Sequence, residues 1–251
     1  MILAGAGRAI LLQLASPAVG HGVARHSDFA QNPMARLHGT LMYVYAVMAG
    51  TPDDLALAQR YVRRKHEPVH GGGAEGVPAY DARDPELQLW VAATLYDTAI
   101  LVHDRVLGHL PEARADALYE RYAALGTALE VPRSMWPADR RAFAKFWTET
   151  SARLTVDDTV RAQADALWTA AAAPRWVRAL MPLNRFVTAD LLPPAVRVAY
   201  GMPWSPRDQR RADLLWGVVR VVYPRLPARW RTWPERYYLR RLRRGVRGAG
   251  A

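Results

Sequence analysis

Apolar residues recur at three- and four-residue spacing along most of the chain, and this is the period of an amphipathic helix. The segment from residue 87 to residue 98 shows the spacing best, with Leu87, Trp90, Val91, Thr94, Leu95 and Thr98. No segment of the sequence shows the alternation that is typical of a strand, and neither repeats nor low-complexity stretches occur. The pattern predicts an all-α fold. Because no linker divides the chain, we expect a single-domain helical bundle.

Capping side chains followed by proline mark three helix starts. The segments are Thr51-Pro52-Asp53-Asp54, Asp84-Pro85-Glu86 and Ser205-Pro206-Arg207-Asp208. Each combines a capping residue, a first-turn proline and an acid, which is the arrangement that helix N-termini favour. Asn32-Pro33 and Trp136-Pro137-Ala138-Asp139 are weaker signals of the same kind. Residues 71–78 are rich in glycine and predict an irregular loop, which lacks the lysine and hydroxyl side chains of a phosphate-binding loop.

Composition limits the chemistry that is available to the chain. Its 251 residues, 51% of them hydrophobic, are enough for one sizeable core. The absence of cysteine excludes disulfides, thiolate metal ligands, iron–sulfur clusters and a cysteine nucleophile. All seven histidines lie at or before His109, so a histidine-ligated metal must be bound by the N-terminal half. No stretch reaches the ~20 apolar residues of a membrane span, and residues 2–19 lack a basic leader, so we expect a cytoplasmic protein.

The net charge of +11 is concentrated near the C-terminus. Residues 225–247 hold nine arginines and one acid, Glu235, which gives this segment a net charge of +8. Nucleic-acid binding usually shows as a basic stripe on the folded domain, whereas this body is nearly balanced, so we expect no nucleic-acid partner. We divide the chain into a domain over residues 1–234 and a basic tail over residues 235–251. The tail is interpreted either as an exposed arginine-rich helix or as a peripheral contact with an anionic membrane.

The segment His66-Glu67-Pro68-Val69-His70-Gly71 supports two different functions. As H-E-x-x-H it matches a zinc peptidase motif, in which two imidazoles on one helical turn bind the metal and the glutamate is the base. Pro68 opposes this interpretation because proline inside a helix costs ~3 kcal/mol. A glycine, Gly76, also stands where the metzincin pattern needs a third histidine. A single imidazole near a helix end, by contrast, suits the axial position of a haem iron.

Five segments together carry a resemblance to a known family. They are residues 5–15 (GAGRAILLQLA), 26–29 (HSDF), 36–40 (RLHGT), 66–71 (HEPVHG) and 80–90 (YDARDPELQLW). In order and spacing they resemble the family that includes the fungal oxygenase MpaB and the bacterial latex-clearing (rubber) oxygenases. The resemblance is densest between Gly5 and Leu107 and weaker from Trp147 to Pro227.

The resemblance implies a globin-like helical core around one b-type haem. His66 matches the family's proximal iron ligand, and Arg36 and Thr40 match the arginine and threonine on the opposite, distal face. Rubber oxygenases carry a lysine immediately before that threonine, where this chain has Gly39. The resemblance therefore implies a distal iron position that no side chain of residue 39 can occupy, and it does not imply rubber as the substrate.

Helix geometry agrees with this distal assignment. At 100° per residue Arg36, Gly39, Thr40, Tyr43 and Val47 share one helix face. We therefore predict that Arg36, Gly39, Thr40 and Tyr43 bind the haem together with His66, and that Arg36 and Thr40 act on the bound oxygen species. The alternative is ordinary core packing around Tyr43 and Val47. His38 points nearly the opposite way and is not expected to be a ligand.

The sequence thus predicts an enzyme, a haem b-dependent oxygenase or related oxidoreductase. Its substrate would be an apolar or bulky organic molecule, with dioxygen or peroxide as the oxidant. Two alternatives remain open, a haem-binding protein without turnover and the zinc peptidase that would use His66, Glu67 and His70. Tyr80 and Asp84 are expected to fix the loop and to cap the next helix, and His26 is expected to have a structural role beside a helix end.

Overall fold

The computed structural model describes residues 2–26, 33–73, 77–170 and 173–247, and within these ranges it is almost entirely helical. One pair of two-residue strands interrupts the helices there, so the predicted all-α fold is confirmed. The elements are η1 (Ile2–Gly5), α1 (Ala6–Leu14), α2 (Pro17–His26), α3 (Pro33–Ala49), α4 (Pro52–His66), β1 (His70–Gly71), β2 (Tyr80–Asp81), α5 (Pro85–Leu107), α6 (Glu112–Thr127), η2 (Arg133–Met135), α7 (Arg140–Ser151), α8 (Asp158–Thr169), α9 (Arg175–Leu191), α10 (Pro194–Ala199), α11 (Pro206–Arg225), α12 (Ala228–Arg231) and α13 (Trp233–Arg247).

The helix starts predicted from capping residues are confirmed. Thr51 and Ser205 each form a reciprocal capping box with the aspartate three residues later, at the starts of α4 and α11. Asp84 accepts a hydrogen bond from the backbone of Glu86 at the start of α5. Asp139 does the same for α7, accepting from a backbone N–H 2.7 Å away. Asn32 lies outside the described residues, and α3 begins at the proline that follows it.

The glycine-rich loop differs from the expectation, because short strands flank it. β1 and β2 pair antiparallel, with His70 opposite Asp81 and Gly71 opposite Tyr80. The Tyr80 hydroxyl also lies 2.9 Å from Nε2 of His26 at the end of α2. Two isolated residues are too few to show the alternation that reveals a strand in sequence. The contact between His26 and Tyr80 agrees with the structural role predicted for both residues.

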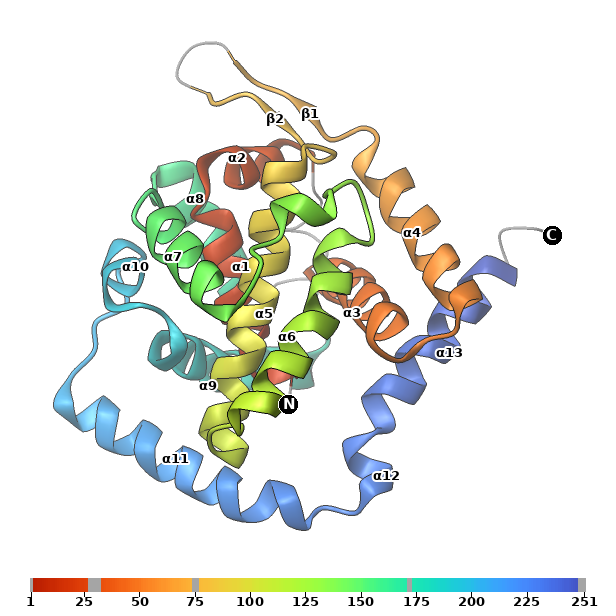
Figure 1. Cartoon of the computed structure of the whole chain (residues 1–251). Helices are drawn as coiled ribbons and strands as arrows, with labels where there is room; N and C mark the ends of the chain where they lie inside the picture. The colour runs from red at the N-terminus through yellow and green to blue at the C-terminus, as the bar shows by residue number, and fades with distance from the viewer. Residues whose placement is uncertain (1, 27–32, 74–76, 171–172, 248–251) are drawn as a thin grey trace.

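The core forms around α1 and α5, which lie side by side, and α2 and α9 pack against α1 (Figure 1). Leu11, Leu12 and Leu14 of α1 are completely buried. Close approach of α9 explains a glycine of the first motif, because a Cβ atom on Gly7 would lie 2.1 Å from Oγ1 of Thr188. Arg8 of the same motif is buried as well. It donates to the backbone carbonyl of Leu191 in α9 and forms an ion pair with Asp97 of α5.

The C-terminal helices run around the outside of this core (Figure 1). α11 contacts α5, and α13 packs across both α3 and α4. Tyr238, Leu239 and Leu242 of α13 are buried, and Arg243 forms a two-pronged ion pair with Asp54 at the start of α4, with both N···O distances 2.7 Å. The part of the interpreted basic tail that is described, residues 235–247, is therefore a packed helix. The boundary drawn at residue 234 falls inside α13, which starts at Trp233, and residues 248–251 lie outside the described ranges.

Candidate functional site

A cavity of about 890 Å³ lies between α1, α3, α5, α6, α9 and α13. This volume is within the ~300–1,000 Å³ that is usual for small-molecule sites. Most of its wall is apolar, formed by residues such as Ala9, Ile10, Leu37, Leu41, Val44, Met48, Leu95, Ala99, Val102, Leu118, Leu125 and Val177. A few polar side chains interrupt this surface, namely Gln13, Arg36, His38, Thr40, Thr98, His103, Tyr122, Asn184, Tyr237 and Tyr238.

Arg36 and Thr40, the residues predicted to act on oxygen, both line this cavity. They lie one helical turn apart on α3, so both side chains project from the same side of the helix. Burial lowers the pKa of Arg36 to about 10, and the guanidinium therefore stays cationic at neutral pH. A cation in a mainly apolar cavity favours an anionic or strongly polarised group nearby.

His66, the predicted proximal ligand, is the last residue of α4. Its Nδ1 atom is buried, and no hydrogen-bond partner for it occurs among the described residues. Burial, followed by the positive charge of Arg36, lowers the pKa of His66 and outweighs the opposite influence of Glu130 and Asp81. The imidazole is therefore neutral at pH 7, which is the form that binds a metal.

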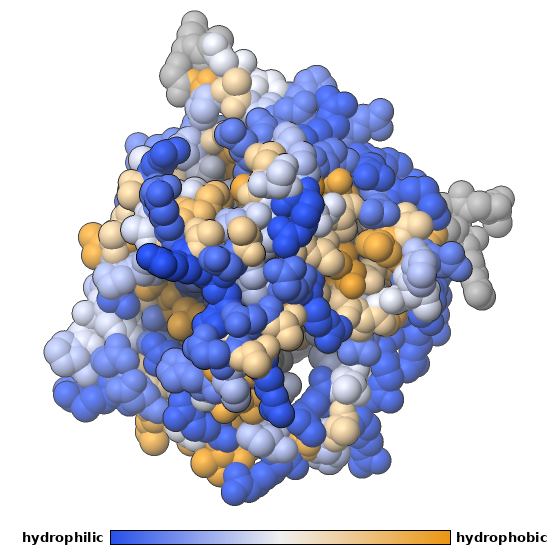
Figure 2. All heavy atoms as spheres, viewed as in Figure 1, coloured by the Kyte–Doolittle hydropathy of each residue, from blue (hydrophilic) through white to orange (hydrophobic). Residues whose placement is uncertain are grey.

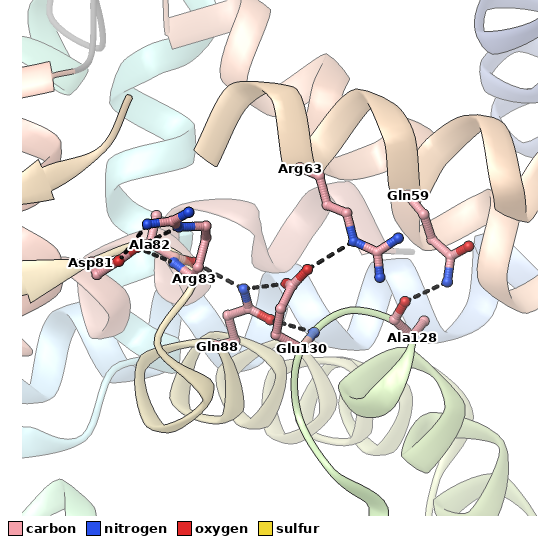
Figure 3. A network of polar contacts seen from close by, with 8 residues as sticks. All are labelled: Gln59, Arg63, Asp81, Ala82, Arg83, Gln88, Ala128 and Glu130. Carbon is pink, nitrogen blue, oxygen red and sulfur yellow. Dashed lines mark hydrogen bonds and ion pairs between the residues drawn. The ribbon is translucent and has the colours of Figure 1, made fainter. Parts of the chain in front are cut away.

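A polar network fixes the last turns of α4, which carry His66 (Figure 3). Arg63 donates to Glu130 over 2.8 Å, and the amide of Gln88 donates to the other carboxylate oxygen over 2.7 Å. Burial alone would raise the pKa of Glu130, but these two hydrogen bonds lower it below its usual range. Gln59, one turn before Arg63, donates to the backbone of Ala128. The end of α4 is thus tied to α5 and to the loop after α6.

Gly39 and Tyr43 do not line the cavity, although both were predicted to bind the cofactor. A Cβ atom on Gly39 would lie 3.3 Å from the Tyr61 hydroxyl of α4, so the space beside this glycine is filled by that phenol. Tyr43 is buried and donates to the carbonyl of Leu125, and burial raises its pKa. The position of Tyr43 matches the alternative of ordinary core packing. Arg36 and Thr40 lie where this packed face meets the cavity.

Two histidines of the cavity wall were not predicted as site residues. His38 was expected to point away, but it lines the cavity, and its Nδ1 lies 2.9 Å from the Tyr238 hydroxyl. The cavity extends to both sides of α3, so a side chain that points away from Arg36 and Thr40 can still line it. His103 of α5 also lines the cavity, and its buried Nδ1 has no hydrogen-bond partner among the described residues. A polar residue at helical spacing between apolar ones, as at His103, was the available signal.

The zinc-peptidase alternative needs His66 and His70 on one helical turn. α4 ends at His66, whereas His70 is exposed and lies in β1. Within the described residues no group of three histidine or acidic side chains is arranged to bind a metal ion. The donor geometry that this alternative requires is therefore not formed in the part of the chain that the structure describes.

The family model for the catalytic domain of ER-bound oxygenase mpaB/B'/rubber oxygenase matches residues 1–222. The chain belongs to this family. An uncharacterized protein of Mycobacterium bovis and one of Mycobacterium tuberculosis are each 36% identical to it over 225 residues, covering 88% of both chains. No solved structure matches the chain significantly. The domain that the oxygenase family shares thus includes the cavity residues of α1, α3, α5, α6 and α9, whereas α12 and α13 lie beyond residue 222.

The residues of this oxygenase-family domain fit a haem in two respects. The neutral imidazole of His66 has a buried ring nitrogen without a partner, and Arg36 places a cation where a propionate could bind. His66 itself is not part of the cavity wall. Arg36 links the cavity to His66, because it lines the cavity and its positive charge lowers the pKa of His66.

Proposed function

We propose that the protein is a haem b-dependent oxygenase that acts on an apolar or bulky organic substrate, with dioxygen or peroxide as the oxidant. The observation that carries this proposal is the neutral, buried imidazole of His66 within the electrostatic reach of Arg36, which itself lines a large apolar cavity. Membership of an oxygenase family supports the reaction class.

His66 would hold the iron, and the haem when bound would supply the redox chemistry. The network around Glu130 would keep the end of α4, and with it the imidazole, in one orientation. Arg36 would bind a carboxylate, either from the haem or from the substrate. Thr40 would donate a hydrogen bond to the oxidant in the cavity. The apolar wall would exclude water and select substrates by burying their hydrocarbon surface.

The environment of Gly39 bears on which side chains of α3 could reach a haem held by His66. Residue 39 offers no side chain, and the Tyr61 phenol fills the space beside it. We propose that residue 39 would supply no iron ligand to a haem held by His66. The ferric protein should then take up cyanide without first displacing a protein nitrogen, and a six-coordinate low-spin spectrum with two nitrogen ligands from the protein would contradict this.

Haem reconstitution of single variants tests the iron ligand. The wild type should bind haem and show a strong Soret band. His66→Ala should lose most of the haem while the far-ultraviolet circular dichroism of its helices persists. His70→Ala is the matched control, because His70 is exposed on β1, and it should keep the haem. His103→Ala tests the second histidine that has an unpartnered nitrogen.

The outcome distinguishes three cases. Loss of haem in His66→Ala alone supports the proposed ligand. Loss in His103→Ala or His70→Ala, with His66→Ala unaffected, rules out the ligand assignment. A wild-type protein that binds zinc stoichiometrically and shows no Soret band would overturn haem dependence and restore the peptidase alternative.

A further inference from the structure

The cavity reaches the protein surface through a mouth that is unusually apolar. Four large hydrophobic residues both line the cavity and are exposed: Leu3 at 40%, Trp176 at 67%, Leu180 at 52% and Trp233 at 57% of their surface. In the space-filling view an opening is visible in the lower half of the molecule, within the arc that α11, α12 and α13 make around the body (Figures 1 and 2). Large apolar side chains that are exposed and also line a cavity indicate a binding surface.

The two tryptophans come from different helices, Trp176 from α9 and Trp233 from α13. Trp176 begins a stripe on α9 that continues at Leu180 and Leu183, all at least half exposed, and these residues are one turn apart on one helix face. Trp233 starts α13 and stacks on Tyr237 with ring centroids 5.2 Å apart, which holds the indole in place at the mouth. Indole rings favour the zone where hydrocarbon meets lipid headgroups, because they combine a large apolar body with one polar N–H group.

The charges beside these tryptophans are positive. Arg175 precedes Trp176 on α9 and Arg178 follows it two residues later, and both are exposed. Exposed Arg229, Arg231 and Arg236 surround Trp233, and Glu235 is the single acid between residues 225 and 247. Arginine next to exposed apolar residues complements a surface of anionic headgroups over hydrocarbon. A protein partner or a second copy of the chain would not require this combination.

We propose that the mouth of the cavity docks peripherally on an anionic lipid bilayer, with Trp176, Leu180 and Trp233 inserted among the headgroups. A lipophilic molecule dissolved in the bilayer then enters the cavity without crossing water. The described part of the chain has no helix long and apolar enough to cross a membrane. The bilayer contact stands on the mouth residues alone, whereas the entry route for a substrate rests on the proposed oxygenase function.

Vesicle flotation tests the contact without need of haem or turnover. The purified full-length protein should float with vesicles of phosphatidylcholine and phosphatidylglycerol in equal parts, and much less with phosphatidylcholine alone. The double variant Trp176→Ala/Trp233→Ala should lose most of this binding. Val198→Ser is the matched control, because Val198 is 74% exposed on α10, on the other side of the molecule from α12 and α13, and it should bind as the wild type does.

A second pair of variants tests the charge. Arg175→Gln/Arg178→Gln should weaken partitioning into anionic vesicles by about thirtyfold, from the usual contribution of an arginine near such a surface. Arg114→Gln/Arg153→Gln removes the same charge from exposed positions that do not line the cavity, and should have a much smaller effect. Added salt should reduce the binding of the wild type more than that of Arg175→Gln/Arg178→Gln.

Several results would overturn the proposal. One is absence of binding to anionic vesicles, and another is a loss of binding in Val198→Ser as large as that in Trp176→Ala/Trp233→Ala. A third is dimerisation in solution that Trp176→Ala/Trp233→Ala abolishes, since this would assign the mouth to a second copy of the chain. Preferential binding of the arginines to duplex DNA in a competition assay would also refute it. Should the double tryptophan variant fail to fold, Leu180→Ser provides the same test with a smaller change.

Discussion

The ion pair between Asp54 and Arg243 provides a stability measurement whose sign and pH dependence follow from the structure. The Asp54 side chain is only 3% exposed. Arg243 donates to both carboxylate oxygens, and the backbone and hydroxyl of Thr51 donate to one of them. The hydrogen bonds from Arg243 hold the pKa of Asp54 well below its usual range, outweighing the effect of burial.

Asp54→Asn removes the charge but keeps the shape of the side chain. Hydrogen bonds to charged groups contribute about 1.5–3 kcal/mol, and water can hydrate the abandoned Arg243, which favours the lower part of this range. We expect the free energy of unfolding to fall by about 2 kcal/mol, which corresponds to about 4–8 °C in melting temperature for a chain of this size. Chemical denaturation followed by circular dichroism measures the difference.

The effect of pH separates this ion pair from a packing defect. Because the folded-state pKa of Asp54 is lowered, the pair contributes its full stability above the unfolded pKa of about 3.9, and the contribution is lost as pH falls toward the folded value. The difference in free energy of unfolding between wild type and Asp54→Asn should therefore be constant between pH ~5 and ~8 and should shrink below pH ~4. Glu120→Gln, which removes an exposed partner of Arg133, should cost no more than ~1 kcal/mol. The reasoning would be refuted if the difference in free energy of unfolding between wild type and Asp54→Asn were the same at low and neutral pH. It would also be refuted if that difference were no larger than the one between wild type and Glu120→Gln.

Three further changes have outcomes that the packing dictates. Gly7→Ala should lower the melting temperature, because its methyl group would collide with Thr188 on the buried side of α1. Gly217→Ala should instead stabilise the protein by about 1 kcal/mol, because nothing lies within 4 Å of the added methyl group on the exposed face of α11. Deleting the chain after Pro234 should cost roughly 5 kcal/mol or more through the loss of three buried side chains, Leu242 among them, and unaltered urea unfolding of the shortened chain would contradict the packing of α13.

The helix starts could be predicted because their signals are local. A cap and its acid lie three residues apart, so the pattern around Thr51 or Ser205 contains the complete interaction. The fold class follows in the same way from the spacing of apolar residues. The role of residues 235–247 could not be predicted as readily, because six arginines dominate the composition there. Tyr238, Leu239 and Leu242 form an apolar stripe among them, which was the signal that this segment is a packed amphipathic helix.

The candidate site shows the same limit. Helix periodicity correctly placed Arg36 and Thr40 together, and both line the cavity. Periodicity shows which residues share a helix face but not which element packs against that face. It therefore could not show that Gly39 lies against Tyr61, or that the Tyr43 hydroxyl donates a hydrogen bond to the C-terminal end of α6. Periodicity also gave no sign that His38 lines the cavity, since α3 borders the cavity over more than one face.

The packing of α13 also sets the order in which the molecule can be completed during its synthesis. Asp54 and Arg243 are separated by 189 positions, so the carboxylate leaves the ribosome long before its partner exists. Contacts of such long range form late in folding, because they close a large loop. A nascent chain that has emerged only as far as α11 already contains the whole domain shared with the oxygenase family, yet α3 and α4 still lack the helix that packs across both of them. Premature termination near the end of translation would therefore yield a product whose cavity has one wall missing.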